Sequence, residues 1–294
     1  MVALNSYPEI MFSEPAIAPQ SHRIRFRLAG GPQPLMLVPV YVNGRGPHEF
    51  ILDTGAGTTI LTPELSAALG VKSTGSKEGQ TAGGKVKVQL AEVQSIALGA
   101  AQREEVDVAI TDLSHLERVV GAKIAGDLGY NFLKHFRLTI DFRDSQLAIN
   151  EPRYASEFPS AVAEVKFRLA APAKPLILVQ AHLNGRGPFQ FAVDTGTSTT
   201  AISPQLARDL NLRQAIIPPV TTGGAQINVS AARIESFAVD GASLRDMDVI
   251  VGDFLEMLST VIGVQLNGII GYNFLKLYKV VIDYPNKTLA LLPP

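Results

Sequence analysis

The chain has 294 residues, of which 46% are hydrophobic and 18% are charged, so it is long enough for one large core or for two domains of ordinary size. The formal net charge of −1 and the absence of any run of Lys and Arg exclude a strongly basic nucleic-acid-binding surface and a polybasic membrane patch. The chain has no cysteine, which excludes disulfides and thiolate metal sites.

No targeting or membrane segment is recognisable in the sequence. Residues 1–20 lack the basic region and the continuous apolar region of a signal peptide, and no apolar stretch is long enough to span a membrane. The compartment is left open, and the cytoplasm is favoured unless a leader has been removed. Abundant Val, Ile, Thr and Phe with dense Gly and Pro are typical of β proteins, so we expect a mostly β fold.

In the first half of the chain, runs rich in apolar and β-branched residues predict strands. These runs are Leu35–Val42, 50–52, 86–98, 106–110 and 138–149. The dipeptide Asn43-Gly44 lies between two such runs and predicts a hairpin turn. Thr62 before Pro63 predicts the start of a short helix that ends near Gly70.

The second half repeats these signals. Asn184-Gly185 predicts a hairpin turn, and Ser203 before Pro204 predicts a short helix that ends near Asn211. In each half, a second short helix is expected after a Gly-Tyr-Asn-Phe-Leu segment. These two segments are 129–133 and 271–275.

The two halves are copies of one another. Segments 26–29 and 43–47 recur at 167–170 and 184–188, at an offset of 141 (167 − 26), and Gly-Tyr-Asn-Phe-Leu recurs at an offset of 142 (271 − 129). We therefore expect two related lobes about a pseudo-two-fold axis, as in a covalently joined C₂ dimer. The expected domains are an N-terminal extension (1–22), lobe 1 (23–150), a linker rich in Pro and Ser (151–162) and lobe 2 (163–294).

Each half contains one Asp-Thr-Gly motif after an apolar run, beginning at Asp53 and at Asp194. The pseudo-two-fold axis would place the two carboxyls side by side, where they cannot both ionise easily and titrate as a unit. With one proton on the pair, one carboxylate can take a proton from water while the other acid protonates a carbonyl, without a metal or a covalent intermediate. The alternative is an ordinary turn, because Asp and Gly favour turns; two copies at equivalent positions favour the dyad.

The residues that follow each aspartate suggest how the pair is held. We expect the hydroxyls of Thr54 and Thr195 to bond the backbone of the opposite lobe; the alternative is that they are ordinary β-branched strand or turn residues. Thr197 follows the second motif and can bond Asp194, whereas Ala56 at the matching place in the first motif cannot bond Asp53. A hydrogen bond to an ionised carboxylate lowers its pKa, so we expect Asp194 to be the more acidic partner.

A glycine-rich segment follows each aspartate and predicts a mobile flap at a hairpin tip, able to cover an extended peptide. The alternative is a surface turn that binds nothing. The segments are Thr81, Ala82, Gly83 and Gly84 in the first half and Thr221, Thr222, Gly223 and Gly224 in the second.

Apolar residues before Gly129 and Gly271 predict an apolar strand packed beneath each aspartate loop. Asp127 is an exception, because it stands where Ile269 stands in the second half, and burying an unpaired charge is costly. We expect Asp127 to be exposed, hydrogen-bonded or paired. The five histidines show no paired metal spacing and there is no Gly-x-Ser-x-Gly motif, so metallohydrolase and serine-triad functions are not favoured and no metal or cofactor is expected.

These features resemble the clan of aspartic proteases that includes retroviral proteases (retropepsins) and pepsins. The resemblance runs through both halves from about Phe26 onwards. It rests on three elements in the same order in each half: Asp-Thr-Gly after an apolar strand, a glycine-rich flap, and an apolar-apolar-Gly segment before a short helix. It implies a bilobal acid-protease fold of two retropepsin-like β lobes, with a cleft between them in which an aspartate-bound water hydrolyses extended peptides.

By this resemblance, Asp53 and Asp194 are the catalytic pair, Gly55 and Gly196 help to hold the water site, and Thr54, Thr195 and Thr197 support the active-site loops. The implied function is an aspartic endopeptidase acting on a polypeptide substrate as a monomer, with no nucleic-acid or membrane partner. Two alternatives stay open: a non-catalytic peptide-binding module on the same fold, and association of two chains through exposed sheet edges.

Overall fold

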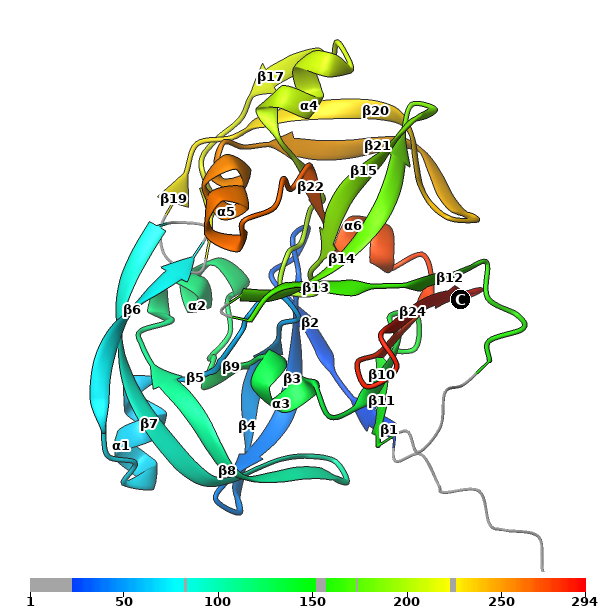
Figure 1. The fold of residues 1–294 in the computed structure, drawn as a ribbon. Helices are drawn as coiled ribbons and strands as arrows, with labels where there is room; N and C mark the ends of the chain where they lie inside the picture. The colour runs from blue at the N-terminus through cyan, green and yellow to red at the C-terminus, as the bar shows by residue number, and fades with distance from the viewer. Residues whose placement is uncertain (1–22, 82–83, 152–156, 173, 223–225) are drawn as a thin grey trace, which may run out of the picture.

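The computed structural model describes residues 23–81, 84–151, 157–172, 174–222 and 226–294. Two β lobes are joined by a central sheet to which both contribute strands (Figure 1). The predicted mostly β, two-lobed architecture is therefore confirmed. Four expected flap residues lie outside the described residues: Ala82, Gly83, Gly223 and Gly224.

Lobe 1 is built on an eight-stranded sheet in which β3 also pairs with β7, so that part of the sheet curls back on itself. In sheet order, its strands are β2 (Arg27–Ala29), β3 (Leu35–Val42), β4 (Arg45–Leu52), β9 (Gly126–Leu128), β5 (Thr59–Leu61), β8 (Ala101–Ile110), β7 (Gly84–Leu98) and β6 (Gly75–Thr81). The turn between β3 and β4 has positive φ at both Asn43 and Gly44, which is the hairpin geometry that the Asn-Gly pair predicts.

Lobe 2 has an eight-stranded sheet with the same order of equivalent strands. These are β13 (Arg168–Ala171), β14 (Lys174–Leu183), β15 (Arg186–Val193), β22 (Gly268–Ile270), β16 (Ala201–Ile202), β21 (Ala242–Val251), β20 (Ser230–Val239) and β17 (Gln214–Ile216). A separate two-stranded sheet is formed by β18 (Val220–Thr221) and β19 (Gln226–Ile227). The shared strand order shows that the sequence duplication is also a structural duplication.

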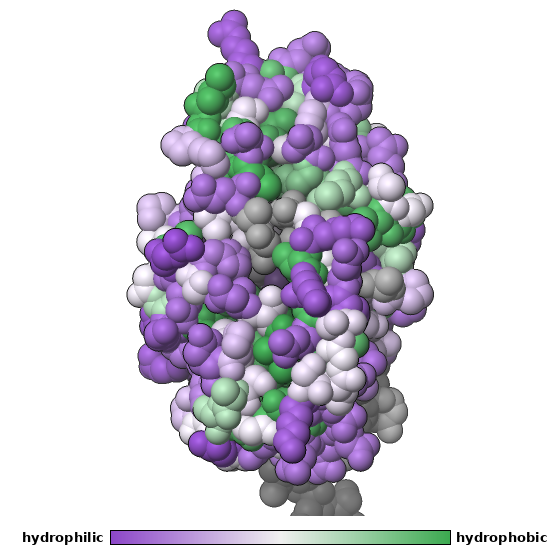
Figure 2. Space-filling model, turned by 90° about the vertical axis from the view of Figure 1, so that its left-hand side faces the viewer, coloured by the Kyte–Doolittle hydropathy of each residue, from purple (hydrophilic) through white to green (hydrophobic). Residues whose placement is uncertain are grey.

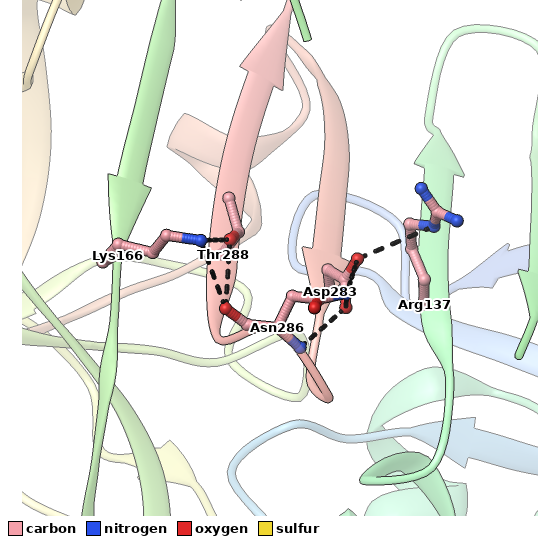
Figure 3. A network of polar contacts seen from close by, with 5 residues as sticks. All are labelled: Arg137, Lys166, Asp283, Asn286 and Thr288. Carbon is pink, nitrogen blue, oxygen red and sulfur yellow. Dashed lines mark hydrogen bonds and ion pairs between the residues drawn. The ribbon is translucent and has the colours of Figure 1, made fainter. Parts of the chain in front are cut away.

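A six-stranded antiparallel sheet joins the lobes. Its strands, in order, are β1 (Arg23–Arg25), β11 (Gln146–Asn150), β10 (Arg137–Asp141), β23 (Lys279–Asp283), β24 (Thr288–Leu292) and β12 (Ala163–Lys166). The two lobes meet where β10 pairs with β23. Figure 3 shows the polar contacts along this sheet: Asp283 accepts hydrogen bonds from Asn286 and faces Arg137 of lobe 1 at 3.8 Å, and Lys166 donates to Thr288 at 2.6 Å.

Six helices are present in the described part of the chain. They are α1 (Pro63–Leu69), α2 (Ser114–Val120), α3 (Tyr130–Leu133), α4 (Pro204–Asp209), α5 (Phe254–Ile262) and α6 (Tyr272–Leu275). The predicted starts of α1 and α4 are confirmed, since Thr62 and Ser203 accept hydrogen bonds from the backbone N–H groups of Leu65 and Leu206. Helix α1 ends at Gly70 in the left-handed conformation.

Two local expectations need correction, and two helices were not expected. The run 138–149 is a hairpin of β10 and β11 rather than one strand, because the turn before β11 has Ser145 at φ 52° between two apolar segments. The second short helix of each half lies inside the Gly-Tyr-Asn-Phe-Leu segment, as α3 and α6, rather than after it. Helices α2 and α5 lack a hydroxyl N-cap hydrogen bond and were not predicted.

The largest hydrophobic cluster runs through both lobes and the joining sheet, and includes Phe50, Phe132, Phe191 and Phe274. Two smaller clusters lie under α2 in lobe 1 and under α5 in lobe 2. On the face that carries β6 and β19, hydrophilic residues predominate and hydrophobic ones form small separate groups (Figure 2). The continuous core fixes the lobes to each other and so sets the geometry of the loops where they meet.

Candidate active site

The two Asp-Thr-Gly loops meet at the pseudo-two-fold axis between the lobes. Asp53 follows β4 and its N–H donates to the carbonyl of Leu128; Asp194 follows β15 and its N–H donates to the carbonyl of Ile270. Each loop thus rests on the neighbouring strand, β9 or β22, which pairs in parallel with the strand before the aspartate. The predicted apolar strand beneath each aspartate loop is present.

The two carboxyls lie against each other. They are within hydrogen-bonding reach, and the charge of Asp53 raises the energy of ionising Asp194. The glycines of the motifs fill the space between them: a Cβ on Gly55 would lie 2.5 Å from the Asp194 carboxyl, and one on Gly196 would lie 2.6 Å from the Asp53 carboxyl. Only glycine fits these positions while the carboxyls stay together.

Hydrogen bonds from backbone N–H groups and one hydroxyl hold the two carboxylates in position. Asp53 Oδ1 accepts from the N–H of Gly55 at 2.6 Å and of Ala56 at 3.1 Å. Asp194 Oδ1 accepts from the N–H of Gly196 at 2.8 Å, and its Oδ2 accepts from the Thr197 hydroxyl at 2.8 Å. The aspartates are therefore held by similar loops but not by identical donors.

Thr54 and Thr195 cross-link the two lobes, as the sequence suggests. The Thr54 hydroxyl donates to the carbonyl of Val193 at 3.0 Å and accepts from the N–H of Thr195 at 3.1 Å. The Thr195 hydroxyl donates to the carbonyl of Leu52 at 2.7 Å and accepts from the N–H of Thr54 at 3.1 Å. Both side chains are buried, so two hydroxyls and four backbone groups at the centre of the molecule are satisfied across the interface.

A second pair of polar residues supports each loop, and sequence analysis missed it. Asn131 Oδ1 accepts from the N–H and the hydroxyl of Thr59, both at 2.8 Å, and the Thr59 hydroxyl accepts from the N–H of Gly129. In lobe 2, Asn273 accepts from the N–H and the hydroxyl of Thr200, again both at 2.8 Å, and the Thr200 hydroxyl accepts from the N–H of Gly271. The available signal was a polar Asn repeated at the same place in two apolar segments.

Asp127 lies beside the dyad, which the sequence did not indicate. It is buried, with 6% of its surface exposed, and its carboxyl is within hydrogen-bonding reach of Asp53. Of the three expectations for this residue, exposure is wrong. The charges of Asp53 and Asp194 act on it, together with the opposite charge of Lys174.

Burial and mutual repulsion dominate the electrostatics of the site. Loss of hydration and the charge of Asp53 raise the pKa of Asp194 to about 8, against the smaller lowering by the Thr197 and Gly196 hydrogen bonds. The pKa of Asp194 is therefore raised, whereas the Thr197 hydroxyl alone was expected to lower it. Burial and Asp53 likewise raise the pKa of Asp127 well above its usual value, and burial raises that of Tyr284, whose hydroxyl is buried without a partner among the described residues.

The expected flap residues within the described structure lie on two different hairpins. Thr81 ends β6 and pairs with Gly84 at the start of β7. Thr221 ends β18, and Thr222 follows it. Strand β18 contacts α2 of lobe 1, so the lobe 2 hairpin reaches the opposite lobe.

No group of three or more His, Asp or Glu side chains in the described part of the chain is arranged to hold a metal ion. Among the described helices, none has both the length and the apolar character needed to cross a membrane.

The family of the chain follows from comparison with known proteins. The model of the aspartyl protease family matches the chain twice, over residues 38–132 and 179–274. Each match includes one Asp-Thr-Gly loop, the hairpin strands that follow it and the strand beneath the loop. The chain therefore belongs to the aspartyl protease family, as a tandem duplication of retropepsin-like lobes. A search of curated proteins found no match.

Proposed function

We propose that the chain is an aspartic endopeptidase in which Asp53 and Asp194 together activate a water for attack on a peptide bond. The observation that carries this proposal is the contact between the two carboxyls across the pseudo-two-fold axis, within loops that are cross-linked through Thr54 and Thr195. Such a pair holds one proton over a wide pH range, which general acid–base hydrolysis requires.

The surroundings of the two carboxyls favour distinct roles. With a pKa of about 8, Asp194 keeps its proton at neutral pH and can donate it to the carbonyl oxygen of the substrate. Asp53, ionised, accepts the proton of the attacking water. The backbone N–H groups of Gly55 and Ala56 stabilise the Asp53 carboxylate before the reaction.

We also propose how the substrate is covered and that one chain forms the complete enzyme. The hairpins of residues 75–98 and 214–239 would cover an extended peptide as flaps. One chain supplies both aspartates, so we propose a monomeric enzyme with an N-terminal extension (1–22), lobes at 23–150 and 163–294, and a linker at 151–162.

The test is peptide cleavage by the whole chain. A diverse peptide library is incubated with wild type, Asp53→Asn and Asp194→Asn at several pH values, and the cut sites are read by mass spectrometry. We expect cleavage by wild type and a loss of at least about a thousandfold in each variant. Wild-type activity should fall as pH rises through about 8, because Asp194 then loses the proton that it donates.

A matched control is Asp112→Asn, since Asp112 is exposed and accepts hydrogen bonds from Ser114 of its own loop. It should cleave as wild type does. Equal cleavage by wild type and both dyad variants would overturn the proposal. Peptide binding by wild type without cleavage at any pH would instead identify a binding module.

A further inference from the structure

The surroundings of Asp127 are apolar except toward the dyad. On β9 it is in register with Ile51 of β4 and with Ile60 of β5, and both isoleucines belong to the apolar cluster under α2. Its Oδ1 is buried and has no hydrogen-bond partner among the described residues. The equivalent residue of lobe 2, Ile269, is equally buried and is part of the apolar cluster under α5.

The charged groups that act on Asp127 are few. Asp53 and Asp194 oppose its ionisation, and Lys174 favours it with a smaller effect. The carboxyls of Asp127 and Asp53 are within hydrogen-bonding reach. Two ionised carboxylates have no proton to share, so this contact becomes a hydrogen bond only if one of them is protonated.

The two lobes differ at two positions next to their aspartates. In lobe 2, the Thr197 hydroxyl donates to Asp194 and Ile269 is apolar. In lobe 1, Ala56 has no hydroxyl and Asp127 has a carboxyl. Asp53 therefore lacks a side-chain donor at position 56, but the carboxyl of Asp127 on strand β9 can supply one.

We propose that protonated Asp127 donates a hydrogen bond to Asp53 and so holds the lobe 1 aspartate, as the Thr197 hydroxyl holds Asp194 in lobe 2. Asp127 is a positioning residue, and its role rests on the proposed proteolytic function. Burial beside two carboxyls raises its pKa, which favours the protonated form that can donate. Its hydrogen bond stabilises the ionised form of Asp53, the form that accepts a proton from water.

Four variants test this role on a peptide cleaved by the wild-type chain. Asp127→Ile copies Ile269 and removes the donor, while Asp127→Asn keeps an N–H donor that does not titrate. The double variant Ala56→Thr/Asp127→Ile copies the arrangement of lobe 2. Ile269→Val is the matched control for a small change on the equivalent strand. All are checked for folding by circular dichroism and thermal unfolding.

In Asp127→Ile, we expect kcat to fall about tenfold or more and the acid limb of its pH profile to move up by about one unit, because Asp53 has lost a charge-assisted hydrogen bond. KM should change little. Asp127→Asn should keep the acid limb of wild type, and the double variant should recover at least part of the lost kcat and the original limb. Ile269→Val should leave the profile unchanged. A kcat and pH profile in Asp127→Ile equal to those of wild type would overturn the inference.

Infrared difference spectroscopy separates this inference from the proposed function, because it needs no substrate. At neutral pH, wild type should show a protonated-carboxyl band that Asp127→Asn removes and that shifts in Asp53→Asn, where the acceptor is uncharged. That band in a protein that cleaves no peptide would preserve the hydrogen bond and overturn the proteolytic function. Cleavage by a protein that lacks the band would support the proteolytic function and overturn the hydrogen bond from Asp127.

Discussion

Lobe 1 and lobe 2 share their backbone framework but differ in the side chains next to the aspartates. The Thr59–Asn131 and Thr200–Asn273 bonds have the same lengths in both lobes. By contrast, Thr197 and Ile269 beside Asp194 are replaced by Ala56 and Asp127 beside Asp53. The Thr and Asn side chains of these bonds can change less freely, because each satisfies a backbone group next to the aspartate loops.

The hairpins of residues 75–98 and 214–239, which we propose as flaps, also differ between the lobes. In lobe 1, β6 pairs with β7 without interruption from Gly75 to Thr81. In lobe 2, pairing with β20 stops after Ile216, and β18 and β19 form a separate sheet. Pro218 and Pro219 lie in the gap, where they supply no N–H for a ladder. The duplicated fold thus keeps the main sheets of the two halves alike while these hairpins diverge.

The largest effect is expected where the two lobes are most alike. Gly55→Ala and Gly196→Ala each place a Cβ within 3 Å of the opposite lobe's carboxyl, so each should lower kcat at least about a hundredfold by separating the dyad. Steady-state kinetics on folded protein measures this. Asp112→Asn is the control, since Asp112 is exposed and lies outside the two Asp-Thr-Gly loops. Near-normal activity in either dyad variant would contradict the equivalence of the loops.

The next effect concerns the cross-links between the lobes. Thr54→Ala and Thr195→Ala each leave a buried carbonyl and a buried N–H without a partner, so each should lower the free energy of unfolding by about 2–4 kcal/mol. Chemical denaturation measures this. Thr→Ser at the same positions keeps the hydroxyl and should recover much of the loss. Unequal losses in the two Ala variants would show that one lobe contributes more to the interface.

The smallest expected effect is a difference between Asp127 and Ile269 in how protein stability depends on pH. A raised folded-state pKa means that Asp127 contributes stability at low pH that is lost as pH rises toward that pKa. Asp127→Asn does not titrate there, so its stability relative to wild type should improve between pH 5 and pH 8. Ile269→Asn buries an amide in an apolar cluster and should be destabilising to the same extent at both pH values. Parallel behaviour of the two variants in denaturant titrations at pH 5 and 8 would contradict this.

Local signals in the sequence predicted much of the framework. The hairpin at Asn43-Gly44 and the caps Thr62 and Ser203 involve residues a few positions apart, and turn and capping chemistry acts over that range. The repeated Asp-Thr-Gly motifs predicted a two-lobed chain with one aspartate from each half. The hairpin of β10 and β11 was missed because apolar residues flank its turn on both sides.

Tertiary structure decided what surrounds the aspartates. Asp127 comes next to Asp53 only because β9 pairs with β4, and no local pattern specifies that pairing. The direction of the Asp194 pKa shift likewise depends on burial and on a charge from the other lobe, which outweigh the nearby Thr197. The sequence by itself determined the duplication, the motifs and their turns, since these are set by neighbouring residues. Burial and charge at the dyad were decided by folding, because both depend on residues that only sheet pairing brings together.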